Sequence, residues 1–162
     1  MAIDRKTLFA RLEKLGIRST TVEHAPVTVE QSSGLRATIP GAHTKNLFLT
    51  DKDGSPVLVV AKDDTRVDLK ALAKRLGLGR FSFGSAELLE KVLGVPAGSV
   101  TPLALMNDTA ARVIVVVDQA LMDFAEVNCH PLENSATTTL ATGDLLRFIE
   151  ATGHQPVIVE LG

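Results

Sequence analysis

Four segments carry apolar residues at the three- to four-residue spacing of an amphipathic helix. The first follows Asp4, a candidate N-cap, and ends at Gly16, a typical left-handed helix stop. The other three begin at a cap on Asp68, at Ser85 and after Gly143, and they stop near Leu76, Gly94 and Gly153. The sequence therefore predicts four helices.

Seven shorter apolar or β-branched runs lie between these helices and are typical of strands. They are Thr20–Glu23, Lys45–Thr50, Val57–Ala61, Arg112–Val117, Phe124–Val127, Thr137–Ala141 and Val157–Glu160. Asp51–Gly54 joins the second and third runs, and its Asp-Gly pair is a hairpin signal. Helices and strands do not alternate strictly, which argues against a doubly wound parallel sheet. We expect an α+β fold with a mixed, mostly antiparallel sheet flanked by helices.

The composition indicates one domain over residues 1–162, because 162 residues with a 45% hydrophobic fraction can bury a sizeable core. A net charge of −2 gives no whole-chain attraction to nucleic acid, so such a partner needs a local basic patch. The absence of tryptophan and tyrosine argues against an aromatic stacking platform. One cysteine suits a reducing compartment, and no segment is typical of a signal peptide or a membrane span. We expect a cytoplasmic protein without a membrane or DNA partner.

The first candidate site is the predicted strand at Lys45–Leu49. Side chains alternate along a strand, so Lys45, Leu47 and Leu49 share one face. Asn46 and Phe48 then lie on the other face. The lysine is either a solvated residue at a strand end or a cation aimed into a pocket.

The second candidate site surrounds His130. Because Pro131 follows, His130 is held extended. It is either a turn residue bonded to the backbone or a positioned donor or acid–base group. Asn134 either serves the same pocket or closes an Asx turn. Cys129 would point away from His130 in an extended segment, so we interpret it as a core residue and not as a nucleophile.

Two further features are weaker. The loop Gly98–Pro102 is either a surface turn or a place where backbone N–H groups approach a carbonyl or phosphate. The basic residues of the second predicted helix and its flanks form either a solvated face or a contact for a phosphate backbone. These residues are Arg66, Lys70, Lys74 and Arg80. The histidines lack metal-ligand spacing and no phosphate-loop or dinucleotide motif is present, so we expect no metal and no cofactor.

Taken together, these segments resemble the YbaK/ProX family of aminoacyl-tRNA deacylases, free-standing relatives of the editing domain inserted in bacterial prolyl-tRNA synthetase. The likeness spans nearly the whole chain and rests on Lys45–Leu49, the GxxxP-type loop Gly98–Pro102 and His130–Thr138. The long form HPLxNxATT, with helix Asp144–Ala151 and Thr152–His154 after it, is most similar to the ProXp-ala (PrdX) branch, which hydrolyses alanyl-tRNA(Pro). The resemblance also implies a barrel-like sheet.

The resemblance implies trans-editing of tRNA(Pro) that prolyl-tRNA synthetase has mischarged with alanine. Lys45 would position the 3′-terminal adenosine and stabilise charge on the ester, and His130 would orient the aminoacyl group. Backbone N–H groups around Gly98 would hold the carbonyl or ribose. Water, helped by the free ribose hydroxyl, would be the nucleophile. Glu133 is the carboxylate within these motifs, and the sequence does not fix its direction.

The remaining expectations concern binding. The predicted substrate-binding residues are Asn46, Leu47, Leu49, Ser99, Asn134, Ser135 and Thr137, and the predicted tRNA-binding residues are Arg66, Lys70, Lys74 and Arg80. The expected partner is the acceptor end of mischarged tRNA(Pro), met either by the free protein or by the protein docked on prolyl-tRNA synthetase. Two other hypotheses stay open: a non-catalytic binder or sensor of an amino acid or aminoacyl end, and a lysine Schiff-base enzyme.

Overall fold

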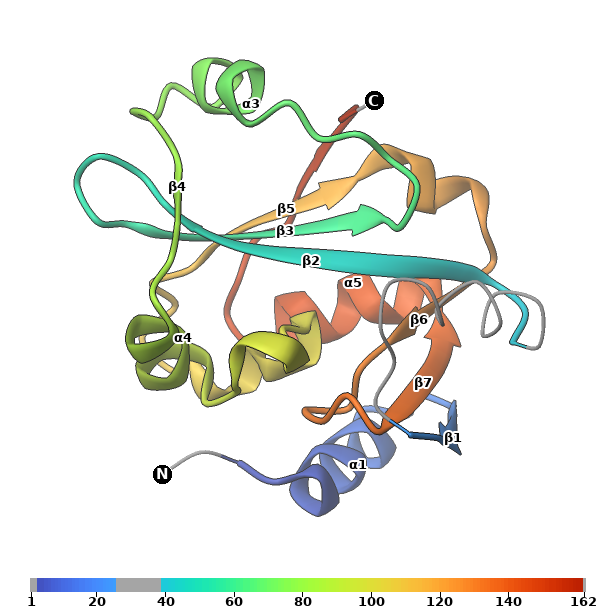
Figure 1. The fold of residues 1–162 in the computed structure, drawn as a ribbon. Helices are drawn as coiled ribbons and strands as arrows, with labels where there is room; N and C mark the ends of the chain where they lie inside the picture. Colours follow the sequence, from blue (N-terminus) through green and yellow to red (C-terminus); the bar gives the residue numbers. More distant parts are fainter. Residues whose placement is uncertain (1–2, 26–38, 162) are drawn as a thin grey trace.

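The computed structural model describes residues 3–25 and 39–161, drawn in colour in Figure 1. The helices are α1 (Arg5–Lys14), α3 (Leu69–Arg75), α4 (Ala86–Leu93) and α5 (Thr142–Ala151), and the 3₁₀ helices are η1 (Ala97–Ser99), η2 (Pro102–Asn107) and η3 (Gln119–Asp123). The strands are β1 (Ser19–Glu23), β2 (Ala42–Thr50), β3 (Pro56–Lys62), β4 (Ser82–Phe83), β5 (Ile114–Asp118), β6 (Glu126–Cys129), β7 (Ala136–Ala141) and β8 (Val157–Val159). None of the helices in these ranges is long and apolar enough to cross a membrane.

The strands form one mixed sheet in the order β1-β7-β6-β2-β3-β5-β8, with β4 added beside β2. Among the described residues four of the seven pairings are antiparallel, while β2–β6, β3–β5 and β5–β8 are parallel. The predicted α+β class with a mixed sheet flanked by helices is confirmed.

Strand β2 joins the two halves of the sheet. Its first residues pair with β6, and the residues from Thr44 onward pair with β3. Ala42 and Phe48 face a first apolar cluster that also takes in residues of α1, α4 and α5, whereas Leu49 faces a second cluster beneath α3. Figure 1 shows this arrangement, with α3 on one side of β2 and β3 and with α4 and α5 on the other.

The helix starts follow from their capping residues. The Asp4 carboxylate accepts from the Thr7 N–H at 2.9 Å, which confirms the predicted N-cap of α1. The carboxylate of Asp68 and the hydroxyl of Ser85 cap α3 and α4 in the same way. Gly94 ends α4 at φ 69°, a left-handed conformation that glycine adopts without a Cβ clash.

Several predicted boundaries were wrong. β2 begins at Ala42 rather than Lys45, because polar His43 and Thr44 still pair with neighbouring strands. Helix α5 begins at Thr142, ahead of Gly143. Strand β6 begins at Glu126 rather than Phe124, because the preceding residues belong to η3 and its cap. The 3₁₀ helices and β4 were not predicted, since such short elements carry no periodic signal.

Candidate functional site

Polar side chains gather on one face of the β1–β7–β6–β2 half of the sheet. Val127 and Cys129 of β6 and Leu140 of β7 point into the first apolar cluster, so the residues alternating with them point the other way. By the same alternation along β2, His43 and Lys45 point to the face opposite that of Ala42. We call this surface the polar face; it consists of His24, His43, Lys45, Asn128, His130, Thr137 and Thr139.

Asn128 anchors the polar face at its centre. The side-chain Nδ2 donates to the Pro40 and Ala42 carbonyl oxygens at 3.1 and 3.2 Å, and Oδ1 accepts from the Thr139 hydroxyl. Thr44 of β2 donates to the Asn128 carbonyl at 2.7 Å. These bonds hold the start of β2 against β6, and they fix the position of the strand that carries Lys45.

His130 directly follows β6 and is held as a neutral imidazole. Its Nδ1 lies 3.2 Å from the Ala136 carbonyl oxygen, and a carbonyl only accepts, so Nδ1 carries the proton. Burial lowers the pKa of His130, with a smaller contribution from nearby His24, while the Ala136 bond opposes the change. Within residues 3–25 and 39–161 the Nε2 atom has no hydrogen-bond partner, so in this part of the chain it is an acceptor open to a ligand.

His24 stands beside His130 and was missed as a site residue by sequence reasoning. Its backbone N–H donates to the Ser135 carbonyl at 2.9 Å, which extends the β1–β7 pairing by one position. The ring Nδ1 lies 2.7 Å from the Ala25 carbonyl oxygen, and Nε2 lies 2.8 Å from the Thr137 hydroxyl oxygen. Sequence reasoning had tested His24 only as a metal ligand, and its contact with Thr137 spans 113 positions.

Lys45 and His130 each lie two residues beyond His43 and Asn128, the last pair of the parallel β2–β6 ladder. Alternation therefore points both side chains to the face that carries His43 and Asn128. Lys45 is partly buried. Its ammonium has no ion pair or hydrogen bond within residues 3–25 and 39–161, which leaves this cation available to a ligand.

Asn46 faces the opposite side of β2, with Phe48. Its Oδ1 atom is buried and has no hydrogen-bond partner within the described part of the chain. A buried acceptor without a partner carries a desolvation cost of about 1–3 kcal/mol, which a donor from a ligand would offset.

The GxxxP-type loop meets the loop between β6 and β7. A Cβ added at Gly98 would lie 3.2 Å from Asn134 Nδ2, so a side chain at residue 98 would press on that amide. Ser99 is 3% exposed and its N–H donates to the Pro96 carbonyl at 2.9 Å. In this conformation Ser99 therefore packs inside the protein, which does not fit its predicted contact with substrate.

The loop that follows His130 is fixed from both sides. Leu132 adopts φ 71°, a left-handed value unusual for leucine, and its side chain is anchored in the first apolar cluster. Arg5 of α1 bonds both to Glu133, at 3.2 Å, and to Glu23 of β1. The direction that the sequence left open is now clear: Glu133 turns outward to Arg5, so it supplies no base to the polar face.

Cys129 is a core residue, as expected. It is 3% exposed, and burial raises the pKa of its thiol to about 12. The thiolate needed for nucleophilic attack is therefore absent at neutral pH.

The apolar residues of β2 have different surroundings. Leu49 has no exposed surface and packs in the second apolar cluster with Leu72 and Phe81. This placement does not fit the predicted role of Leu49 in a pocket wall. Leu47 is only partly buried and remains a candidate for that wall.

The predicted tRNA-binding residues lie on and around α3. Arg66, Lys70, Lys74 and Arg80 are all exposed, while Leu72 is buried beneath the helix. Leu49, which shares the Lys45 face of β2, packs in the second apolar cluster beneath α3, so α3 lies on the same side of β2 as Lys45, where Figure 1 shows it.

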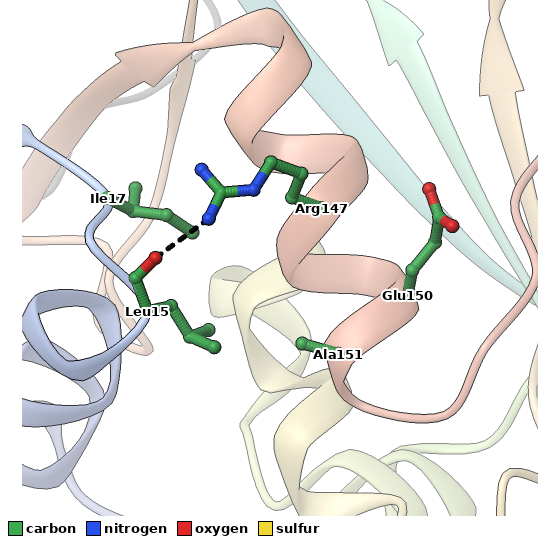
Figure 2. A pocket seen from close by; sticks show the side chains of 5 residues that line it. All are labelled: Leu15, Ile17, Arg147, Glu150 and Ala151. Atoms are coloured by element: carbon green, nitrogen blue, oxygen red, sulfur yellow. Dashed lines mark hydrogen bonds between the residues drawn. The ribbon is translucent and has the colours of Figure 1, made fainter.

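Two other features have structural explanations. Figure 2 shows a hollow between the end of α1 and α5, lined by Arg147. The Arg147 guanidinium donates to the Leu15 carbonyl and pairs with the Asp144 carboxylate, each at 2.8 Å, so it already has partners within the protein. His154 and Asp108 form a buried pair at 2.7 Å that ties the end of α5 to the loop after η2. No group of three or more potential ligands in the described ranges could hold a metal ion.

Comparison with known proteins supplies the family. The model of the aminoacyl-tRNA editing domain matches residues 24–148, a span that runs from His24 through the whole polar face to α5. The chain belongs to the aminoacyl-tRNA editing domain family. This confirms the resemblance on which the sequence-based prediction rested.

Relatives agree over nearly the full length. The chain is 41% identical to prolyl-tRNA synthetase associated domain-containing protein 1 of Danio rerio, over 96% of this chain and 86% of that protein. It is 37% identical to the prolyl-tRNA editing protein ProX of Acetoanaerobium sticklandii, over 97% of each. A crystal structure described as a candidate trans-editing enzyme for prolyl-tRNA synthetase superposes with a TM-score of 0.72 at 19% identity, covering 100% of this chain and 99% of that one. That last likeness shows the shared fold.

Proposed function

We propose that this protein is an aminoacyl-tRNA deacylase that hydrolyses the ester of mischarged alanyl-tRNA(Pro). One observation carries the proposal: within residues 3–25 and 39–161, the Lys45 ammonium has no ion pair or hydrogen bond, His130 Nε2 has no partner, the two residues share one face, and the nearby thiol of Cys129 is buried in the core. Such a site suits attack by water on an ester. Family membership and the ProX relative support the hydrolase class.

The reaction needs few protein groups. The water oxygen bonds to the ester carbonyl carbon, the carbon–oxygen bond to the terminal ribose breaks, and that ribose oxygen takes a proton as alanine leaves. Lys45 stabilises the negative charge that develops on the carbonyl oxygen. His130 Nε2 orients the aminoacyl group and offers a hydrogen-bond acceptor on the reacting side. The ribose hydroxyl next to the ester assists the water.

Selection for alanine is proposed to rest on size. A binding site discriminates weakly against a smaller substrate, with about 1–3 kcal/mol for one methylene, so a second hydrolytic site that excludes the larger amino acid adds fidelity. The proposed wall of this pocket consists of Thr137, which belongs to the polar face, Ser135, two residues before it, and Leu47, on the Lys45 face of β2. The buried Oδ1 of Asn46 lies on the opposite face of β2 from Lys45, so Asn46 is left out of the proposed pocket.

The wider setting follows the same proposal. Residues 1–162 act as one editing domain in the cytoplasm, with the acceptor end of tRNA(Pro) as partner and with docking on prolyl-tRNA synthetase as a further mode. The exposed cations around α3 would contact the tRNA backbone beyond the acceptor end.

A panel of mischarged tRNAs under single-turnover conditions tests the function. Release of alanine from alanyl-tRNA(Pro), with prolyl-tRNA(Pro) spared, is the expected result. Binding of the aminoacyl end without any hydrolysis would favour the alternative of a sensor or adaptor. Borohydride trapping of a carbonyl substrate on Lys45 would favour a Schiff-base enzyme.

A further inference from the structure

The hydrogen bonds around His24 determine which atoms of Thr137 remain available. The Ala25 carbonyl can only accept, so His24 Nδ1, 2.7 Å away, must donate to it. In a neutral imidazole with a protonated Nδ1, Nε2 carries no proton. When His24 is neutral, the 2.8 Å contact between Nε2 and Oγ1 is therefore a bond in which the Thr137 hydroxyl donates to His24.

This bond uses the one hydrogen that a threonine hydroxyl possesses. Thr137 is left with lone pairs only, and whatever else touches its oxygen has to be a hydrogen-bond donor. The side chain is 5% exposed, so an acceptor held in this way is shielded from bulk water. Neutral His24 thus leaves the Thr137 hydroxyl oxygen able to act only as a hydrogen-bond acceptor towards a ligand.

The acceptor lies next to the position proposed for the aminoacyl group. Thr137 follows Ala136, whose carbonyl orients His130, and it shares the polar face with that imidazole. None of the residues that make up the polar face is a carboxylate, because the nearby Glu23 and Glu133 both turn to Arg5. A donor on the substrate must therefore be met here by neutral acceptors.

We propose that Thr137, oriented by His24, accepts a hydrogen bond from the α-amino group of the aminoacyl ester. An α-amino group carries N–H donors in both of its protonation states, and it is the feature that separates an aminoacyl ester from a simple acyl ester. His24 is then a positioning residue for the reaction, and Thr137 is a substrate-binding residue with a stated partner. This inference rests on the proposed deacylase function.

The test compares two substrates that differ in the amino group alone: alanyl-tRNA(Pro) and propionyl-tRNA(Pro). Loss of a hydrogen bond to a charged group lowers a rate by roughly 10- to 100-fold. We expect Thr137→Val to lower the single-turnover rate on the alanyl ester by this factor and to leave the propionyl ester unaffected. Thr137→Ser, which keeps the hydroxyl, should stay close to wild type on both.

Matched controls separate recognition from folding. Thr138 is the neighbour on the other face of β7, and its hydroxyl bonds to that of Thr21 at 2.8 Å. Thr138→Val should cost similar stability and leave the ratio of the two rates unchanged. His24→Leu should reproduce the selective loss of Thr137→Val, and His24→Gln should restore part of the rate, because an amide oxygen can accept from Thr137.

The outcomes are distinguishable. Equal losses on both esters for Thr137→Val, or no loss on either, would overturn the inference while leaving the deacylase function intact. Failure of the wild-type protein to hydrolyse alanyl-tRNA(Pro) would instead reject the proposed function. If thermal unfolding shows that Thr137→Val does not fold, the His24→Leu and His24→Gln variants test the inference instead. His24 is partly exposed, so its replacement opens no core cavity.

Discussion

Replacement of Lys45 by alanine should abolish most of the deacylase activity without unfolding the protein. The ammonium has no ion pair or hydrogen bond within the described ranges, so its removal breaks no polar contact there. Substitutions away from such contacts usually change the free energy of unfolding by no more than about 0.5 kcal/mol. The folded Lys45→Ala protein should therefore melt close to the wild type.

The size of the activity loss follows from the charge that Lys45 supplies. A unit charge about 4 Å from a developing oxyanion, at an effective dielectric constant of about 20, interacts by about 4 kcal/mol. Lys45 is only partly buried, so solvent screening reduces this value. Removal of one preorganised donor typically lowers the rate by about 10²–10³-fold. We expect a loss in that range.

The assay is single-turnover release of alanine from alanyl-tRNA(Pro), with Lys62→Ala as the matched control. Lys62 ends the neighbouring strand and pairs with Thr44, so it points to the face opposite Lys45 and bonds to Asp64 instead. Lys62→Ala should hydrolyse the ester at the wild-type rate. Near-normal turnover by a folded Lys45→Ala protein would refute the assignment of Lys45 to the site.

Three further predictions concern proton, loop and tRNA contacts. The hydrolysis rate should fall on the acid side with a midpoint below pH 6.5, because burial lowers the pKa of His130 and the neutral ring is the active form. The unfolded chain binds the proton first, so the free energy of unfolding should also decrease as the pH drops from 6.5 through the lowered pKa. A midpoint above 6.5 in the pH–rate profile would contradict this prediction. Gly98→Ala should slow hydrolysis with little change in melting temperature, since its Cβ would displace the amide of Asn134, and an unchanged rate would separate this loop from the site. Charge reversal at Lys70 and Lys74 should raise the apparent KM for tRNA and flatten its salt dependence, while the hydrolysis rate of a minimal aminoacyl-adenosine stays unchanged. Equal losses of rate on both substrates would mean that these lysines support the fold and do not contact tRNA.

The helices and most strands could be predicted because each carries a local signal. Single residues beside a helical apolar pattern mark the helix ends: Asp4 and Asp68 cap two helices, and Gly94 ends a third. The parallel pairing of β3, β5 and β8 has no such local mark, because it joins segments far apart in the chain. The start of β2 was missed since the pairing of His43 is decided by Asn128 of another strand.

The sequence could indicate candidate site residues only where they belong to segments with a recognisable motif. Lys45 and His130 were proposed in this way, and alternation beyond the His43–Asn128 pair points them to one face. His24 escaped, because a single histidine after a strand has no pattern and its partner Thr137 lies 113 positions away. Leu49 was over-interpreted: alternation gave its face correctly, but the sequence could not show that α3 covers that part of the face.

The relative rates on alanyl-tRNA(Pro) and prolyl-tRNA(Pro) test the central claim most directly. Both esters are presented to the wild-type protein in excess under identical single-turnover conditions, with the uncatalysed rate of each subtracted. A pocket that admits the methyl group of alanine and excludes the pyrrolidine ring should release alanine and leave prolyl-tRNA(Pro) intact. Equal release of both amino acids would contradict selection by size, and release of neither would contradict the hydrolytic function itself.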